Sequence, residues 1–220
     1  MPIANETQIA SFRDWTLRFR SPEVEGGRGL IVLLHGWTGN ENVMWVFAHK
    51  LMPDHWIIAP RGLIKADGGG YGWAVHRQGV DTTVDQFAPA CQALHTLIQD
   101  WQTTHDLDPA DLILIGFSQG AALAFSYALL YPGQVVALAG LAGFLPRGAG
   151  EYLSARPLNG RKVFIAHGTR DDTVPISFAK EAVEGLEKAG AEVTYCETDA
   201  THKLGAACLR GLNQFFSGRG

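Results

Sequence analysis

The chain has 220 residues, of which 46% are hydrophobic and 18% are charged, and its formal net charge is −4. This balance is typical of a folded globular domain and excludes an extensively disordered chain. The acidic excess also argues against a nucleic-acid-binding protein, because such proteins carry a basic surface. The length predicts a single domain over residues 1–220.

The N-terminal segment and the cysteines bear on the compartment. The N-terminal segment lacks the apolar core of a signal peptide, and no apolar run is long enough to span a membrane. Cys91, Cys196 and Cys208 are odd in number and lack a C-x-x-C spacing. We therefore expect reduced thiols in a cytoplasmic protein that does not insert stably into membranes. A homodimer is compatible with the sequence.

The apolar pattern predicts strands that alternate with helices. Trp15–Arg20 alternates apolar and polar side chains, which is typical of a half-exposed, antiparallel edge strand. Continuous apolar runs predict buried strands over Leu30–Leu34, Trp56–Ala59, Leu112–Ile115, Val135–Leu141, Lys162–Ala166 and Glu192–Cys196. We expect one helix from Asn40 or Glu41 to about Leu51, and another from the end of the pentapeptide Gly116–Gly120 to about Tyr131. Further helices are expected over Asp81–His105, Ser177–Ala189 and Leu204–Phe216.

This alternation predicts an α/β fold. Strands that follow one another through helices form βαβ units, with a mostly parallel central sheet and helices on both faces. No stretch is long enough to form a separate cap domain. Pro60–Gly79 is a long Gly-rich loop, and loops of this length inside a compact domain are usually functional.

The segment Asp111–Tyr131 carries the most specific motif. A buried strand leads into Gly116-Phe117-Ser118-Gln119-Gly120, and an Ala-rich helix follows. The pentapeptide alone could arise by chance among 26 glycines, but the strand and the helix on either side make the pattern specific. This context is that of a nucleophile elbow, in which the central serine stands at the tip of a strained turn. We therefore expect Ser118 to be a nucleophile.

A serine nucleophile needs a histidine base that is oriented by an acid. His202 follows the last predicted strand and is the best placed of the eight histidines. Asp171 and Asp172 follow the preceding strand, and Asp199 is a third candidate acid. Loops after parallel strands meet at one edge of a sheet, so these side chains can converge on Ser118. The order nucleophile, acid, histidine is the order found in α/β-hydrolases.

The chain resembles the phospholipase/carboxylesterase family of small α/β-hydrolases, which includes the acyl-protein thioesterases. The matching pieces are Leu34-His35-Gly36, Ala59-Pro60-Arg61, Gly72-Trp73, Gly116–Gly120, His167-Gly168, Asp171, Val174-Pro175 and His202. The resemblance implies Ser118 as nucleophile, Asp171 as acid, His202 as base, and the backbone N–H groups of Trp37 and Gln119 as the oxyanion hole. Many thioesterase members have a Leu-Gly-Asp-like run after His-Gly, where this chain has Trp37-Thr38-Gly39-Asn40.

The resemblance implies a serine carboxylesterase that works through an acyl-enzyme, with a thioesterase or lysophospholipase as the alternative. A non-catalytic binding protein is the alternative from another class. Without a cap domain, an open site suits short-chain or bulky-headed esters. Trp37 and Trp73 are expected to form pocket walls, and His76 is a candidate substrate contact. We expect His35 and His167 to fix loops by hydrogen bonds. The histidines lack metal-ligand spacing, and we expect neither a metal nor a cofactor.

Overall fold

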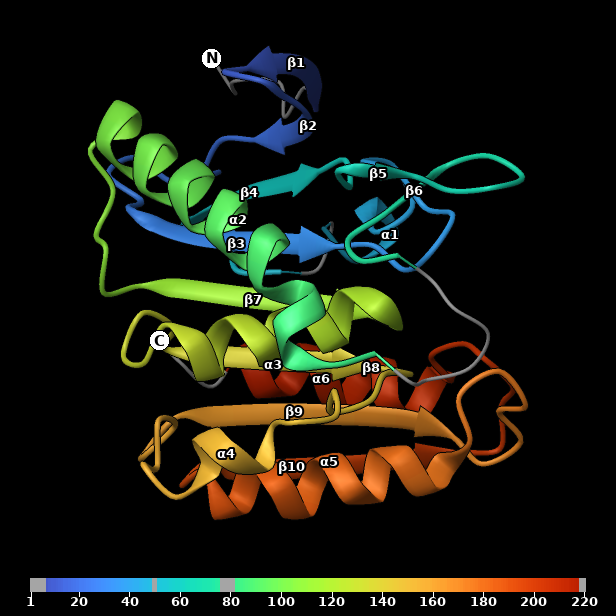
Figure 1. Ribbon diagram of the computed structural model, residues 1–220. Helices are drawn as coiled ribbons and strands as arrows, with labels where there is room; N and C mark the ends of the chain where they lie inside the picture. Colours follow the sequence, from blue (N-terminus) through green and yellow to red (C-terminus); the bar gives the residue numbers. More distant parts are fainter. Residues whose placement is uncertain (1–6, 49–50, 76–81, 218–220) are drawn as a thin grey trace.

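The computed structural model describes residues 7–48, 51–75 and 82–217, and its centre is an eight-stranded sheet (Figure 1). The strands follow the spatial order β1-β2-β4-β3-β7-β8-β9-β10. Their bounds are β1 Gln8–Phe12, β2 Trp15–Arg20, β3 Gly29–Leu34, β4 His55–Pro60, β7 Leu112–Phe117, β8 Ala137–Leu141, β9 Lys162–Gly168 and β10 Glu192–Thr198. From β4 to β10 every neighbouring pair is parallel, whereas β1 and β2 pair antiparallel. The expected mostly parallel sheet is confirmed.

Helices cover both faces of the sheet. Their bounds are α1 Trp45–Ala48, α2 Val84–His105, α3 Gln119–Leu130, α4 Gly150–Leu153, α5 Ile176–Lys188 and α6 Ala206–Ser217. Helices α2, α3 and α5 pack on one face with Leu30, Val32 and Leu34 of β3, while α1 and α6 pack on the other with Ile31 and Leu33. A strand that is buried on both faces must be apolar at every position, which explains the continuous apolar run of β3.

The N-terminal edge of the sheet differs from the expectation. Trp15–Arg20 forms an antiparallel strand as expected, but it lies between β1 and β4 and is not the edge. The edge strand is Gln8–Phe12, which the sequence did not predict because its side chains are mostly exposed and show little apolar periodicity. The correction adds one strand and leaves the order of the others intact.

The helix after β3 begins later than expected. The described helix is Trp45–Ala48, whereas we expected a helix from Asn40 or Glu41 to about Leu51, and residues 49 and 50 lie outside the described residues. The Asn40 side-chain oxygen accepts the backbone N–H of Asn42 at 2.9 Å. Such a side-chain bond offers the backbone an alternative to the helix, which delays the start of the helix.

Helix α2 begins at Val84, later than the expected Asp81, which lies outside the described residues. Thr83 and Gln86 form a capping box, in which each side chain accepts a backbone N–H of the other residue. These bonds satisfy N–H groups that the first helical turn leaves unpaired, and so they fix the start of the helix. Helix α2 ends at His105 as expected.

The long loop before α2 contains a small hairpin that the sequence did not predict. Strands β5 (Ile64–Lys65) and β6 (Tyr71–Gly72) pair antiparallel. The N–H of Tyr71 donates to the carbonyl oxygen of Gly39 at 2.8 Å, so the hairpin is tied to the loop that follows β3. Two-residue strands are too short to leave a period in the sequence.

The expectation of three reduced thiols is wrong for two of them. Cys196 of β10 and Cys208 of α6 form a disulfide with a Cα–Cα distance of 5.7 Å. Their separation of 12 residues is bridged because the chain returns from β10 through α6 to the same place. Cys91 is free and buried, and burial raises the pKa of its thiol to about 12.

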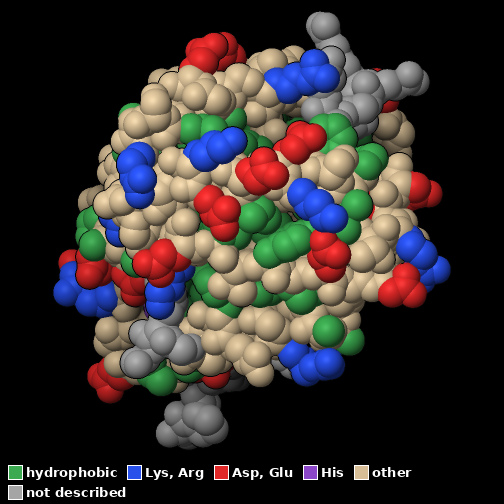
Figure 2. Space-filling view, turned by 90° about the horizontal axis from the view of Figure 1, so that it is seen from below, with side chains coloured by type: hydrophobic (Ala, Val, Ile, Leu, Met, Phe, Trp, Pro, Cys, Tyr) green, Lys and Arg blue, Asp and Glu red, His purple; other side chains and the backbone are tan. Residues whose placement is uncertain are grey.

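The surface shows no concentration of one sign of charge on the face formed by α5 and β10. Figure 2 shows acidic and basic side chains interspersed there, with small separate apolar areas between them. Among the helices of the described ranges, none combines the length and the apolar character that a membrane-spanning helix needs.

Candidate active site

Ser118 stands between β7 and α3 with φ 52° and ψ −117°. This conformation costs a non-glycine residue free energy, and the surrounding contacts hold it. Added Cβ atoms would lie 2.2 Å from the Gly120 carbonyl oxygen at Gly116, and 2.1 Å from the Leu34 carbonyl oxygen at Gly120. Only glycine fits at either position. The Ser118 N–H also donates to the Leu141 carbonyl oxygen at 2.8 Å.

His202 and Asp171 lie on the loops after β10 and β9 and converge on Ser118. His202 Nε2 lies 3.0 Å from Ser118 Oγ, and His202 Nδ1 lies 2.7 Å from Asp171 Oδ2. The Asp171 side chain is fully buried, and its Oδ1 accepts the N–H groups of Thr173 and Val174 at 3.0 and 2.9 Å. These bonds stabilise the carboxylate and fix its orientation. An ionised Asp171 keeps the proton on His202 Nδ1 and leaves Nε2 free to accept.

The other candidate acids lie elsewhere. Asp172 is exposed, and the exposed Asp199 pairs with Arg170 on the surface. His167 is buried, and its Nε2 donates to the Val174 carbonyl oxygen at 2.8 Å. That bond closes the turn around Asp171, so His167 fixes a loop as expected.

The loop after β3 passes beside Ser118. A Cβ added at Gly36 would lie 3.2 Å from the Ser118 Cβ, so Trp37 directly follows a residue that packs against Ser118. Thr38 has a positive φ of 64°, and the Gly39 N–H donates back to the Gly36 carbonyl oxygen at 3.1 Å. The backbone around Trp37 therefore forms a tight turn at the edge of the site.

Hydrogen bonds of the His35 and Trp73 side chains hold this turn. His35 Nδ1 donates to the Gly36 carbonyl oxygen at 2.7 Å, and His35 Nε2 accepts the Gly62 N–H at 2.8 Å. Burial lowers the pKa of His35, which keeps the imidazole neutral and able to accept. Trp73 is only 2% exposed, and its indole N–H donates to the His35 carbonyl oxygen at 2.7 Å. Trp73 therefore belongs to the core and does not line the cavity described below. His76 lies outside the described residues.

The Gln119 side chain has a role that sequence reasoning missed. Its Oε1 accepts the Trp73 N–H at 2.8 Å, and its Nε2 donates to the Ala74 carbonyl oxygen at 2.9 Å. Since Gln119 directly follows Ser118, these bonds join the elbow to Trp73 and Ala74 of the Gly-rich loop. The sequence analysis singled out both Gly72-Trp73 and Gly116–Gly120 as pieces that match the family. Only the fold shows that the two segments meet.

An ion pair between the buried Glu41 and the partly exposed Arg61 holds the far end of the same turn. Glu41 is 4% exposed, and its two carboxylate oxygens accept Arg61 Nε and Nη2 at 2.8 Å each. The hydrogen bonds from Arg61 lower the pKa of Glu41. The sequence marked Arg61 through Ala59-Pro60-Arg61 but gave no signal for its partner.

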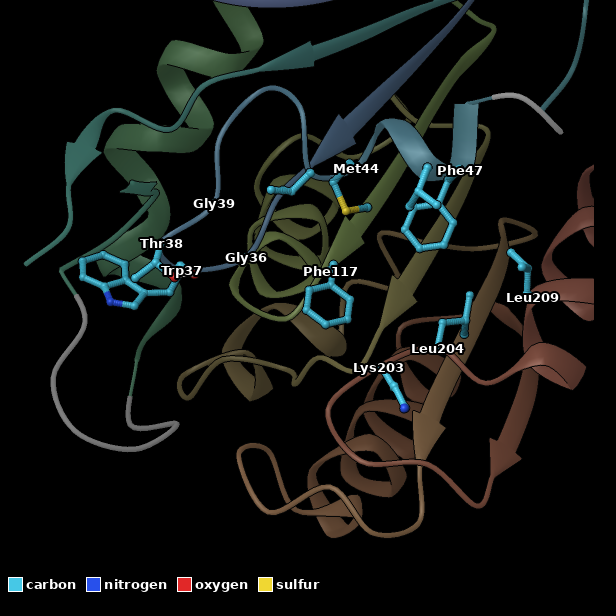
Figure 3. A pocket seen from close by; sticks show the side chains of 12 residues that line it. Gly36, Trp37, Thr38, Gly39, Met44, Phe47, Phe117, Lys203, Leu204 and Leu209 are labelled. Carbon is cyan, nitrogen blue, oxygen red and sulfur yellow. Dashed lines mark hydrogen bonds between the residues drawn. The ribbon is translucent and has the colours of Figure 1, made fainter. Parts of the chain in front are cut away.

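A cavity of about 480 Å³ opens beside Ser118, on the sheet face that α1 and α6 cover (Figure 3). The described residues that line it are Gly36, Trp37, Thr38, Gly39, Val43, Met44, Val46, Phe47, Phe117, Lys203, Leu204 and Leu209. The Phe117 ring lies 5.0 Å from the His202 ring, measured between centroids. The Trp37 indole points away from Phe117 (Figure 3) and lies over Gly72. Trp37 therefore borders the cavity with the part of the residue close to its backbone.

Comparison with known proteins identifies the family. The model of the phospholipase/carboxylesterase family matches residues 21–217. The chain belongs to the phospholipase/carboxylesterase family. It is therefore a serine hydrolase, as the resemblance implied.

The relatives of this phospholipase/carboxylesterase family member include two yeast proteins named acyl-protein thioesterase 1. The protein from Debaryomyces hansenii is 30% identical over 74% of this chain and 78% of its own length. The protein from Kluyveromyces lactis is 32% identical over 76% of this chain and 79% of its own length. The crystal structure of a Bacillus cereus carboxylesterase superposes with a TM-score of 0.84 at 20% identity, over 94% of this chain and 95% of that chain. The family member therefore has the α/β-hydrolase fold.

Among the residues that the structure describes, no group of three or more histidine, cysteine or acidic side chains is arranged to hold a metal ion. The reactive groups of the site are the hydroxyl, imidazole and carboxylate described above.

Proposed function

We propose that the protein hydrolyses carboxylic esters through an acyl-enzyme on Ser118. The observation that carries the proposal is the chain of two hydrogen bonds from Ser118 Oγ through His202 to Asp171. His202 Nε2 takes the hydroxyl proton as Ser118 Oγ attacks the carbonyl carbon. Asp171 holds the imidazole in the required tautomer and stabilises its positive charge. The same nitrogen then gives the proton to the leaving alcohol.

The negative charge on the carbonyl oxygen needs hydrogen-bond donors in the first tetrahedral intermediate. We assign the backbone N–H groups of Trp37 and Gln119 to this role, because Trp37 lies on the turn beside Ser118 and Gln119 begins α3. The N-terminus of a helix favours negative charge. Loss of one such donor lowers kcat about 10²–10³-fold in other hydrolases. Water activated by His202 then releases the acid and restores Ser118.

The leaving group is an alcohol if the protein is a carboxylesterase and a thiol if it is a thioesterase. The two yeast relatives are named acyl-protein thioesterases, which favours thioesters as the second substrate class. Rates on an oxygen ester and a thioester of equal acyl length separate the two readings.

The decisive test replaces Ser118. We expect the protein to hydrolyse p-nitrophenyl acetate and butyrate, and Ser118→Ala to lower kcat by at least about 10⁴-fold, by analogy with other serine hydrolases. Ser177→Ala is the matched control, because Ser177 is exposed on α5 far along the chain. Unchanged turnover by Ser118→Ala would remove the proposal. A protein that neither turns over these esters nor reacts with a fluorophosphonate probe would be a non-catalytic binding protein.

The single domain, the cytoplasmic location and the homodimer stay predictions. The Cys196–Cys208 disulfide bears on the location, because disulfides are rare in reducing compartments. Cell fractionation with alkylation of free thiols tests the location, and light scattering tests the dimer.

A further inference from the structure

The cavity on the α1 and α6 side lies next to the catalytic base. Phe117 lines the cavity, and its ring lies 5.0 Å from the His202 ring, measured between centroids. Lys203 and Leu204 also line the cavity, and they directly follow His202 in the chain. Figure 3 shows Phe117 in the middle of the group, with Met44 and Phe47 on one side and Leu204 and Leu209 on another. The turn at Gly36 and residues adjacent to His202, in the chain or in space, therefore line the cavity.

The proposed reaction fixes which part of an ester lies near that imidazole. His202 Nε2 must give its proton to the leaving oxygen, and a proton donor acts over a hydrogen-bond distance. The alcohol part of the ester therefore starts beside the His202 ring, on the side of Phe117 and Leu204. We propose that the cavity binds the alcohol part and that the preferred alcohol is apolar. This inference rests on the proposed function and adds the substrate class to it.

The chemistry of the walls supports an apolar alcohol. The wall side chains of Met44, Phe47, Phe117, Leu204 and Leu209 are hydrophobic. Lys203 alone is charged among the described lining residues, and its ammonium group points away from Phe117 (Figure 3). A volume of about 480 Å³ is within the range of small-molecule sites. A phosphorylated or otherwise charged leaving group would lack a buried partner among these side chains.

The rim of the cavity is apolar as well. Val43 and Val46 line it although they are 50% and 71% exposed. Apolar side chains at an open rim accept the far end of a longer alcohol without enclosing it. We therefore expect the rate to rise with the length of the alcohol and then level off.

Kinetics distinguish an alcohol site from an acyl site. The alcohol has left before the acyl-enzyme is hydrolysed, so an alcohol site changes acylation and leaves deacylation unchanged. An acyl site changes both steps. In a series of acetates from methyl to hexyl, kcat/KM should rise about two- to fourfold per methylene until the cavity is filled, as expected for partial burial of each methylene. Methyl esters from acetate to hexanoate should show a flatter series.

A substitution that narrows the cavity tests its place. Leu209→Trp enlarges a wall residue on α6, and Arg210→Trp is the control, because Arg210 is exposed on the same helix. We expect Leu209→Trp to lower kcat/KM for hexyl acetate at least tenfold and to change kcat/KM for methyl acetate and methyl hexanoate less than threefold. Arg210→Trp should leave all three rates unchanged. A larger loss on methyl hexanoate than on hexyl acetate would overturn the inference in favour of an acyl site.

A measurement on the unsubstituted protein keeps the test open if Leu209→Trp does not fold. Added alcohols compete with water for the acetyl-enzyme formed from p-nitrophenyl acetate: the alcohol oxygen attacks the acetyl carbon, its proton passes to His202 and then to Ser118, and an acetate ester leaves. Since a leaving alcohol and an attacking alcohol share one position, hexan-1-ol should saturate this transfer at a lower concentration than methanol. Equal, unsaturated transfer to both would overturn the inference. Turnover of p-nitrophenyl acetate that depends on Ser118 would leave the proposed function standing in that case.

Discussion

The two loops that supply Ser118 and His202 are held in different ways. Ser118 sits between a strand that is buried at every position except Phe117 and a helix whose residues are buried almost throughout. Its position follows from backbone packing at Gly116 and Gly120. His202 keeps 22% of its side chain exposed and lies in a loop between Cys196 and Cys208, whose disulfide closes that loop.

The comparison shows two routes to a fixed geometry. Core packing places the nucleophile, so changes there act on the whole fold. A covalent bond and hydrogen bonds from the loop after β9 place the base. The N–H groups of Thr169 and Arg170 donate to the carbonyl oxygens of Thr198 and Ala200 at 2.8 and 3.0 Å. These bonds hold only the first half of the base loop. At its other end the disulfide adds a covalent link to the packing of α6 on the sheet.

The largest effect is expected from a substitution on the nucleophile side. Gly120→Ala places a Cβ 2.1 Å from the Leu34 carbonyl oxygen and 2.6 Å from that of His35. Backbone on both sides cannot yield cheaply, so we expect a loss of about 3 kcal/mol in the free energy of unfolding. Activity should fall as well, since the shift separates the turn at Gly36 from Ser118. Urea denaturation and p-nitrophenyl acetate assays measure the two effects.

Gly150→Ala is the matched control. A Cβ at Gly150 meets nothing within 4 Å, and Gly150 begins helix α4. Alanine is favoured over glycine in a helix by up to about 1 kcal/mol, so this variant should be at least as stable as the parent. Equal stability of both variants would contradict the role assigned to close backbone packing at the elbow.

The second effect is expected on the base side. Reduction of the disulfide opens a loop spanning a separation of 12 residues, which costs about 3 kcal/mol in the chain-entropy model. The far end of the His202 loop is then held by the packing of α6 on the sheet without a covalent bond, and a displaced base lowers kcat/KM by up to about 10²-fold. Denatured thiol counts should rise from one to three on reduction, because only Cys91 is free beforehand.

The double variant Cys196→Ala/Cys208→Ala controls for effects of the reductant elsewhere. It should already have the lower activity, and adding reductant should change nothing further. An unchanged kcat/KM in parent protein whose thiol count has risen to three would show that hydrogen bonds and the packing of α6 are enough to hold His202. The two loops would then not differ in the way described above.

Sequence alone gave most of the sheet and the local part of the site. The strand, pentapeptide and helix around Ser118 are contiguous, so their pattern is visible without the fold. Residue types alone left Asp171, Asp172 and Asp199 as open alternatives, because which carboxylate faces His202 depends on the turn after β9. The family resemblance was needed to choose among them.

The features that the sequence missed depend on segments that meet only in the fold. The disulfide forms because α6 returns to β10, and the Gln119 side chain bonds to Trp73 of the Gly-rich loop, which is distant in the chain. The cavity combines the loop after β3, α1, Phe117 and the segment after His202. Trp73 was expected on a pocket wall because it lies in a loop, but its indole N–H bonds to His35 in the core. Position in a loop does not determine burial.

The smallest effect concerns the turn that carries Trp37 and its dependence on pH. The hydrogen bonds from Arg61 lower the pKa of Glu41, although burial acts against them. Because the pKa of Glu41 is lower in the folded state, its ionised carboxylate contributes to the free energy of unfolding. This contribution is complete above the unfolded-state pKa, about 4.3, and it is lost as the pH falls through the lower, folded-state pKa. We expect Glu41→Gln to cost about 1 kcal/mol in the free energy of unfolding at pH 7 and to flatten the loss of stability on acidification.

Urea midpoints between neutral and acidic pH measure both changes, and Glu25→Gln is the control because Glu25 is exposed. If the parent and Glu41→Gln lose stability in parallel as the pH falls, the pair does not anchor the turn through its charge. The loop after β3 would then be joined to the Gly-rich loop by uncharged hydrogen bonds, such as those from Gly62 to His35 and from Tyr71 to Gly39.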